Sequence, residues 1–264
     1  VQAVYGGLTE QQIAQKYPET KAARPKSQPS NLKSQISTLK SQISNLNPQI
    51  SNLKPQCFRA PTDNDKSFGN WLAKDWKRCG LDTITIPMTT ERDGNEYTFT
   101  FSIPDNLPEL PRIGICIELP REYEQLAWYG RGPWDNYPDR KAACPIALWQ
   151  SSVSRQYVHY PRPQDSGNHE DCAMVELRTK SGKVLRIEAV DKLFSFSALP
   201  YSAQYIASKS HDYELKDQQK TYLSIDCAVL GLGNSSCGPG VLKKYSIDKT
   251  KKHQLKIRIT REKK

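Results

Sequence analysis

Short stretches in which apolar and polar positions alternate, or in which β-branched and aromatic residues gather between turn signals, follow one another from residue 81 onward. This pattern predicts β-strands. The expected strands are residues 83–87, 96–103, 114–119, 124–128, 173–178, 184–190, 194–198, 222–229 and 254–260. Many short strands with little helix imply packed antiparallel sheets, so the predicted fold class is all-β.

Turn and cap residues support this assignment. Asp-Gly-Asn at residues 93–95 and Ser-Gly-Lys at residues 181–183 fit hairpin turns. The clear helical candidate is residues 71–79, which Gly80 would end as a C-cap.

Residues 30–56 repeat with a period of seven, as SNLKSQI, STLKSQI, SNLNPQI and SNLKPQ. The leucines and isoleucines of this repeat are spaced by four and three, as in a coiled-coil seam. Pro48 and Pro55 remove helix hydrogen bonds, and Ser and Asn are poor helix formers. A low-complexity linker is therefore favoured over an oligomerisation helix. We expect an N-terminal extension over residues 1–56 and a folded domain over residues 57–264.

Charge and composition narrow the possible functions. A net charge of +10 raises nucleic acid or an anionic surface as partners. Lys and Arg are scattered outside a Lys-rich tail, so a solvated surface is favoured and no nucleic-acid partner is expected. The seven cysteines lack metal-ligand spacing, and most of them are expected to be small buried apolar residues. No apolar run approaches the roughly 18 residues of a membrane span. We expect a soluble protein without a membrane partner, in a bacterial-type cytoplasm or periplasm.

Three loops rich in Gly, Pro, Asn and Asp are candidates for function, because binding residues concentrate in such loops. In residues 59–65, Asp63 and Asp65 could suggest a calcium loop, but the glycine and distal glutamate of an EF-hand are missing. The favoured interpretation is that Asp and Asn side chains cap turns and that Arg59 pairs with an aspartate.

Residues 128–140 carry aromatic side chains, Trp134 and Tyr137 among them, whose faces could stack on a sugar. Asp135 and Asn136 could hydrogen-bond to sugar hydroxyls.

Within the same stretch, Asp139 and Arg140 are expected to be local structural partners. The glycines also suggest a glycine-rich phosphate-binding loop. Such a loop must be followed by the start of a helix, which Pro133 disfavours here.

Residues 231–240 form the third loop. It contains two serines but no GxSxG elbow. A nucleophilic Cys237 would need a basic partner, which the sequence does not place beside it. A tight structural loop is the favoured interpretation.

Six segments in this order carry a family resemblance: residues 59–65, 110–114, 130–140, 160–168, 194–198 with His211, and 231–239. Together they resemble the small-chain or C-terminal domain of family 2 β-galactosidases, over roughly three quarters of the chain. Each motif is weak by itself, but six in the right order are highly specific.

The resemblance implies a large antiparallel supersandwich similar to the galactose mutarotase fold, which packs on a catalytic (β/α)8 barrel and lends loops to its sugar site. By this resemblance Gly132 is a hinge at the rim of the site. Cys237 stands near the position where some members bring a Trp to the sugar, so that stacking platform is lost or replaced. The implied substrate-binding residues are Gly132, Trp134, Asp135, Asn136, Tyr137, Asn234 and Cys237.

Retaining glycosidases use two carboxyl groups roughly 5–5.5 Å apart. In the family both belong to the barrel, and no segment here matches a barrel of about 250 residues. The resemblance therefore implies a non-catalytic chain, inactive alone, with a catalytic barrel and a galactoside as partners. It implies no cofactor in this chain, and any Mg²⁺ or Na⁺ would belong to the absent barrel.

Two alternatives stay open. A free-standing carbohydrate-binding module would bind galactosides through the aromatic residues of the stretch 128–137. A self-sufficient mutarotase-like enzyme would need a histidine and an acid that converge on the concave face of the sandwich. The candidates for that pair are His159, His169, Glu170 and His211.

Overall fold

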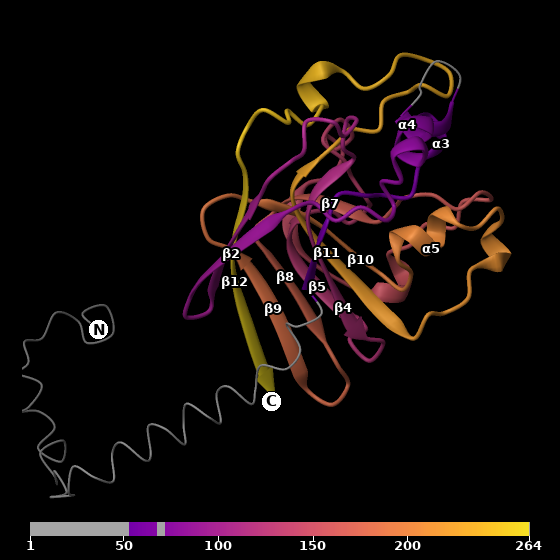
Figure 1. The fold of residues 1–264 in the computed structure, drawn as a ribbon. Helices are drawn as coiled ribbons and strands as arrows, with labels where there is room; N and C mark the ends of the chain where they lie inside the picture. The colour runs from indigo at the N-terminus through magenta and orange to yellow at the C-terminus, as the bar shows by residue number, and fades with distance from the viewer. Residues whose placement is uncertain (1–52, 68–71, 264) are drawn as a thin grey trace, which may run out of the picture. The chain divides into compact units, whose positions relative to one another are not determined.

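The computed structural model of the chain describes residues 53–67 and 72–263, and Figure 1 shows their fold. The predictions that fall on residues 1–52 lie outside the described residues. Within them the fold is an all-β sandwich of two antiparallel sheets, which confirms the predicted fold class. Helices α3, α4 and α5 lie on one side of the sandwich in Figure 1.

The first sheet has five strands in the order β1-β4-β11-β10-β7. Their bounds are Leu53–Gln56, Arg112–Pro120, Lys220–Val229, Phe194–Leu199 and Asn168–Cys172. The second sheet has seven strands in the order β2-β3-β12-β9-β8-β5-β6. Their bounds are Met88–Asp93, Glu96–Phe101, His253–Lys263, Lys183–Ala189, Met174–Arg178, Gln125–Arg131 and Ile146–Ser152.

The helical elements are short. The α-helices are α3 (Asp63–Lys66), α4 (Leu72–Cys79) and α5 (Ala203–Ala207), and the 3-10 turns are η3 (Val153–Arg155), η4 (Asp212–Glu214) and η5 (Lys243–Tyr245). The predicted helix is confirmed over α4, and Gly80 follows it with a φ of 68°, as its C-cap role requires. Both predicted hairpin turns are present, between β2 and β3 and between β8 and β9.

The predicted strand at residues 83–87 is wrong, because the chain reaches its first paired residue of that hairpin at Met88. The prediction missed β6 and β7. It also missed β1, whose register pairs Leu53 with Ile117 and Gln56 with Gly114. The folded domain therefore includes Leu53–Gln56, and the predicted start at residue 57 is too late. Pro55 is tolerated there because β1 is an edge strand.

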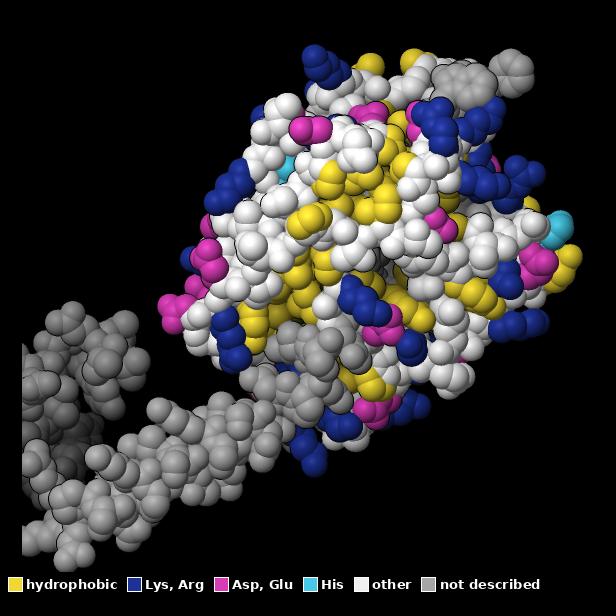
Figure 2. All heavy atoms as spheres, viewed as in Figure 1, with side chains coloured by type: hydrophobic (Ala, Val, Ile, Leu, Met, Phe, Trp, Pro, Cys, Tyr) yellow, Lys and Arg dark blue, Asp and Glu magenta, His cyan; other side chains and the backbone are white. Residues whose placement is uncertain are grey.

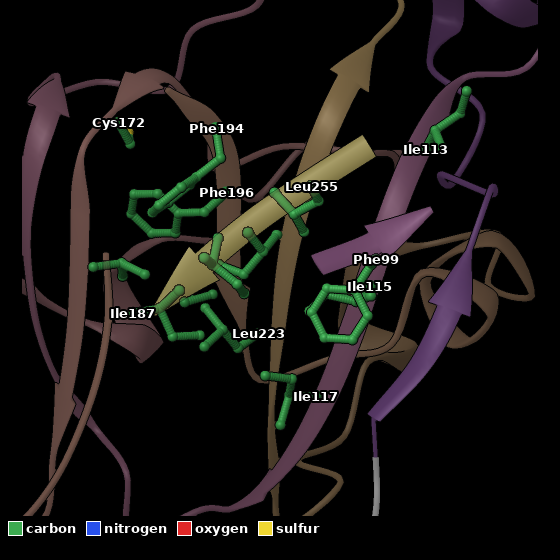
Figure 3. Close-up of a cluster of buried hydrophobic side chains, with 14 of the residues drawn as sticks. Phe99, Ile113, Ile115, Ile117, Cys172, Ile187, Phe194, Phe196, Leu223 and Leu255 are labelled. Atoms are coloured by element: carbon green, nitrogen blue, oxygen red, sulfur yellow. The ribbon is translucent and has the colours of Figure 1, made fainter. Parts of the chain in front are cut away.

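The core lies between the two sheets, where alternating strand positions point inward. In Figure 3, Ile115, Ile117, Leu223 and Phe196 of the five-stranded sheet face side chains of the other sheet, such as Phe99. Strand β3 shows the expected period of two, since Tyr97, Phe99 and Phe101 are buried and the residues between them are half-buried. Hydrophobic alternation therefore specified which face of β3 enters the core.

On the face seen in Figure 2, Lys and Arg lie mostly along the margins with Asp and Glu among them, and hydrophobic side chains gather between them. Across the described part of the chain, no helix is both long and apolar enough to cross a membrane.

Candidate functional site

The three candidate loops meet one another, and a fourth loop, residues 160–168, joins them. Nδ2 of Asn64 in the first loop donates to the carbonyl oxygen of Gly233 in the third, at 2.9 Å. The backbone N–H of Asp63 donates to Oε1 of Gln164 in the fourth loop, at 2.8 Å. The second loop bonds to both the third and the fourth loop. The four loops are therefore one hydrogen-bonded cluster, which we call the loop cluster: residues 59–67, 132–140, 160–168 and 231–240.

Arg59 is the buried centre of the first loop, and it pairs with an aspartate as predicted. Its Nη2 lies 2.8 Å from Oδ1 of Asp65, and both side chains are fully buried. Its Nη1 donates to the carbonyl oxygen of Leu230 at 2.8 Å, and its Nη2 also donates to that of Gly231. Asp65 also accepts from the backbone and hydroxyl of Thr62, which caps α3. The ion pair ties the first loop to the start of the third.

The second loop leaves β5 at Arg131 and exposes one large aromatic side chain. Trp134 is 67% exposed, the most exposed tryptophan among the described residues. Gly132 is buried, and a Cβ there would lie 2.8 Å from Nε1 of Trp149, so the backbone needs a glycine for this close approach. The Trp134 ring is thus presented on a loop whose first residue is tightly packed.

The next three predicted residues differ in accessibility. Asp135 is half-buried and accepts from the backbone N–H of Gly167 at 3.3 Å, and burial raises the pKa of its carboxyl. Asn136 is fully buried, and its Oδ1 accepts from the backbone N–H of Glu170 at 2.8 Å. Tyr137 is also buried. The side chains of Asn136 and Tyr137 hold the loop in place instead of facing solvent.

Tyr137 connects the second loop to the fourth. Its hydroxyl donates to Oδ2 of Asp165 at 2.8 Å. Burial, reinforced by the nearby Asp165 carboxylate, raises the pKa of Tyr137 well above its ordinary value, so the phenol keeps the proton that it donates.

Asp139 and Arg140 are structural residues as predicted, but their partners lie in the third loop. The Asp139 carboxylate accepts from the backbone N–H groups of Leu232 at 2.9 Å and Gly233 at 2.8 Å. Arg140 donates to the carbonyl oxygen of Gly233 and to Oδ1 of Asn234.

Replacement of Asp139 tests this connection. We expect Asp139→Asn to lower the free energy of unfolding by about 2 kcal/mol, because an amide keeps one acceptor oxygen and places an N–H₂ against the second backbone donor. Asp191 is a matched control, since its exposed carboxylate accepts a local bond from the backbone N–H of the next residue, Lys192. Asp191→Asn should change the same quantity by less than about 0.5 kcal/mol. Equal urea midpoints for the two variants would contradict the role given to Asp139.

Asn234 and Cys237 complete the predicted set, and both are exposed. The Asn234 carbonyl oxygen accepts from the backbone N–H of Cys237 at 3.0 Å, and this forms a tight turn. Cys237 is a free thiol on that turn. The tight structural loop expected for residues 231–240 is present, and a sugar contact by Asn234 or Cys237 stays a prediction.

The buried His169 and the exposed His211 lie in separate segments and have different partners. His169 is 1% exposed, and its ring nitrogens lie near the carbonyl oxygen of Arg131 and Oε1 of Gln156. His211 is exposed beside Glu214 in a separate segment. In the described part of the chain His169 thus has no carboxylate hydrogen-bonded to its ring, and the mutarotase-like alternative gains no support from it.

The prediction also left His159 and Glu170 as candidates for that pair. His159 is exposed and pairs with Asp212, whereas the buried Glu170 accepts from Nδ2 of Asn168. Among the described residues, no group of three or more His, Cys, Asp or Glu side chains is placed to hold a metal ion.

The residues that organise the fourth loop were not singled out from the sequence. Gln164, Asp165 and Asn168 are buried and receive or donate the bonds that hold the other loops. The sequence feature that could have drawn attention to them is the high density of polar and turn residues at positions 160–168, Tyr-Pro-Arg-Pro-Gln-Asp-Ser-Gly-Asn. That density marked a loop but could not show which other loops it meets.

The structure thus defines the class of protein: a two-sheet antiparallel sandwich whose connecting loops form one cluster. A family model described as "Beta galactosidase small chain" matches residues 27–259. The chain belongs to this family.

Curated relatives agree with the family match. A β-galactosidase of Arthrobacter sp. (strain B7) is 30% identical over 245 residues, and the match covers 72% of this chain and 24% of that protein. One of Staphylococcus xylosus is 28% identical over 227 residues and covers 72% and 22%. The β-galactosidase BgaC of Bifidobacterium adolescentis is 32% identical over 212 residues and covers 67% and 20%. The chain spans about a quarter of the length of these relatives or less.

Proposed function

We propose that this chain is a non-catalytic part of a β-galactosidase, and that its loop cluster completes the galactoside site of a catalytic barrel outside this sequence. The exposed Trp134 is the observation that carries the proposal. Trp134 is 67% exposed, and its loop is held in place by the hydrogen bonds of Tyr137 and Asp139 to the fourth and third loops. An aromatic face held out from a fixed base suits contact with the apolar face of a sugar.

The acids of the loop cluster support the non-catalytic assignment. Retaining hydrolysis needs two carboxyl groups about 5–5.5 Å apart, one as acid and one as nucleophile. Here Asp65 is bound to Arg59, Asp139 to backbone N–H groups, and Asp165 to the Tyr137 hydroxyl. These three carboxylates hold loops together, which supports the proposal that acids of the catalytic barrel cleave the glycosidic bond.

The same proposal assigns the remaining partners. Any Mg²⁺ or Na⁺ that the enzyme uses would be held by the catalytic part. The substrate would be a terminal β-D-galactoside, in keeping with the names of the relatives. We assign no nucleic acid or membrane as a partner, and we place the protein in a bacterial cytoplasm or periplasm.

A chimera tests this function. The region of the Arthrobacter relative that this chain matches would be replaced by this chain, and hydrolysis of o-nitrophenyl β-D-galactopyranoside would be measured. We expect no hydrolysis by this chain alone and hydrolysis by the chimera. Trp134→Ala in the chimera should lower kcat/KM by about 5- to 150-fold, since the loss of a stacked ring is worth about 1–3 kcal/mol.

Tyr213→Ala is the matched control, because Tyr213 is 73% exposed and stacks on His211 in another part of the domain. It should leave kcat/KM unchanged. Hydrolysis by the chain alone, or equal effects of the two substitutions, would count against the proposal.

The exposure of Trp134 also favours a second candidate, a free-standing carbohydrate-binding module. Such a module would bind lactose without the catalytic part, and Trp134→Ala would abolish that binding. Isothermal titration of the purified chain with lactose separates the two candidates. A domain that needs the catalytic part should give no heat of lactose binding that Trp134→Ala removes.

A further inference from the structure

One carboxylate outside the loop cluster meets both ends of the loop that carries Trp134. That loop, which we call the Trp134 loop, comprises residues 132–145 between β5 and β6. Asp171, on β7, accepts from Nε of Arg131, the last residue before the loop, at 2.5 Å. Both of its carboxylate oxygens also lie 2.9 Å from Nζ of Lys141, near the far end of the loop. Asp171 therefore holds the loop at its start and near its end.

Arg131 extends this restraint into the loop itself. Its Nη1 donates to the carbonyl oxygens of Lys141 at 3.1 Å and of Cys144 at 2.9 Å. The thiol of Cys144 in turn donates to the carbonyl oxygen of Trp134, with Sγ 3.7 Å from that oxygen. A continuous series of contacts thus leads from the Asp171 carboxylate to the backbone of Trp134.

The backbone of β7 is shaped in a way that presents this carboxylate. The pairing of β7 with β10 shifts its register between Phe194 and Phe196, which leaves one extra residue in β7. Such a β-bulge re-aims a side chain, and bulges are frequent beside functional sites. Asp171 lies in the bulge with a φ of 54°, a left-handed conformation that is uncommon for residues other than glycine. That conformation costs some free energy, which the bonds to Arg131 and Lys141 offset.

The three charged side chains form a network that is partly shielded from water. Arg131, Lys141 and Asp171 are each half-buried. Burial opposes ionisation of Asp171, but the hydrogen bonds from the two cations outweigh it and lower the pKa of the carboxyl. The carboxylate is therefore charged at neutral pH. Hydrogen bonds between ionised groups are stronger than neutral ones, which suits a contact that must hold a loop in one position.

We propose that Asp171 is a positioning residue, which holds the Trp134 loop at both ends and thereby fixes where the Trp134 ring meets the galactoside. This proposal rests on the function proposed for Trp134. Asp171 acts through Arg131 and Cys144 and is assigned no contact with the sugar.

Amide hydrogen exchange of the whole chain tests the restraint directly. Asp171→Asn keeps the size of the side chain and tolerates a positive φ, but it removes the charge that pairs with the two cations. We expect the amides of residues 132–145 to exchange faster by about fivefold or more. Glu118→Gln is the matched control, because Glu118 pairs with Lys54 and Lys220 and its side chain is also 27% exposed. It should leave exchange in the Trp134 loop within about twofold.

The Arthrobacter chimera tests whether the ring is positioned. We expect Asp171→Asn to lower kcat/KM by about threefold or more, because a displaced ring loses part of its contact with the sugar. In the Trp134→Ala background the same substitution should change kcat/KM by less than about twofold, because no ring is left to position. A purely structural residue would give the same loss in both backgrounds. Glu118→Gln should leave kcat/KM unchanged in both.

Two results would overturn the proposal. The first is exchange in the Trp134 loop that is as slow in Asp171→Asn as in Glu118→Gln. The second is a loss of kcat/KM on Asp171→Asn that is equally large when Trp134 is replaced by alanine. A chimera in which Trp134→Ala changes nothing would instead contradict the function proposed for Trp134, and the exchange rates would still decide whether Asp171 holds the loop. If Asp171→Asn does not fold, Lys141→Met removes one of the two cations from the loop side and is judged by the same two measurements.

Discussion

Arg59→Met should lower the free energy of unfolding by about 3–5 kcal/mol, which is the loss expected when one partner of a buried ion pair is removed. Asp65 would remain fully buried without its cation, since the two side chains are 0% exposed in the pair. The carbonyl oxygens of Leu230 and Gly231 would lose their donors in the same step. The Arg59 guanidinium also lies 5.7 Å from the centre of the Trp76 ring, so Trp76 fluorescence should follow the transition.

Arg78→Met is the matched control for this measurement. Arg78 pairs with Asp75 within α4, but its side chain is 82% exposed, and pairs of this kind contribute up to about 1 kcal/mol. Urea unfolding of the two variants compares the same substitution in a buried and an exposed pair. If Arg59→Met were no more costly than Arg78→Met, the buried pair would not be what joins the first loop to the third.

Lowering the pH from 7.5 to 4 should remove about 3 kcal/mol of stability through His169 alone. The ring is 1% exposed and packs between Trp128 and Phe196, and burial lowers its pKa from 6.5 to about 4. The His169 imidazole therefore takes up a proton near pH 6.5 in the unfolded chain but only near pH 4 in the folded chain. The stabilisation is fully present above pH 6.5 and is lost as the pH falls toward 4.

The measurement is the free energy of unfolding against pH for the wild-type chain and His169→Phe. The Phe variant has no imidazole to protonate. Between pH 7.5 and 4, the free energy of unfolding of the wild-type chain should therefore fall by about 3 kcal/mol relative to that of the variant. Asp226 acts in the opposite direction, because burial raises its pKa from 3.8 to about 6 and its contribution grows as the pH falls. It is present in both proteins and cancels in the difference. Parallel curves would contradict the assignment to His169.

Local sequence patterns predicted those features that depend on near neighbours. Alternation predicted β3 because one face of that strand enters the core, and Gly80 ended α4 because its φ of 68° suits a residue without a Cβ. The pairing of Arg59 with an aspartate was also predictable, because Asp65 is six positions away and lies on the same loop.

Strand β7 shows where such patterns fail. Its sequence Asn-His-Glu-Asp-Cys has no apolar alternation, yet four of its five residues are buried. Two of them are held by polar partners, through the bonds from Asn168 to Asn136 and from the Glu170 backbone to the same residue. Polar burial of this kind leaves no hydrophobic period in the sequence, because hydrogen bonds from distant segments replace apolar contacts.

The sequence by itself determined the all-β class, most strands, the family and the three loops that hold the candidate site. The tertiary structure alone decided that these loops meet and that Trp134 faces solvent while Asn136 and Tyr137 do not. The physical reason is the distance along the chain between partners. Asn64 and Gly233 are 169 positions apart, and no local pattern encodes a hydrogen bond that exists only after two sheets have packed.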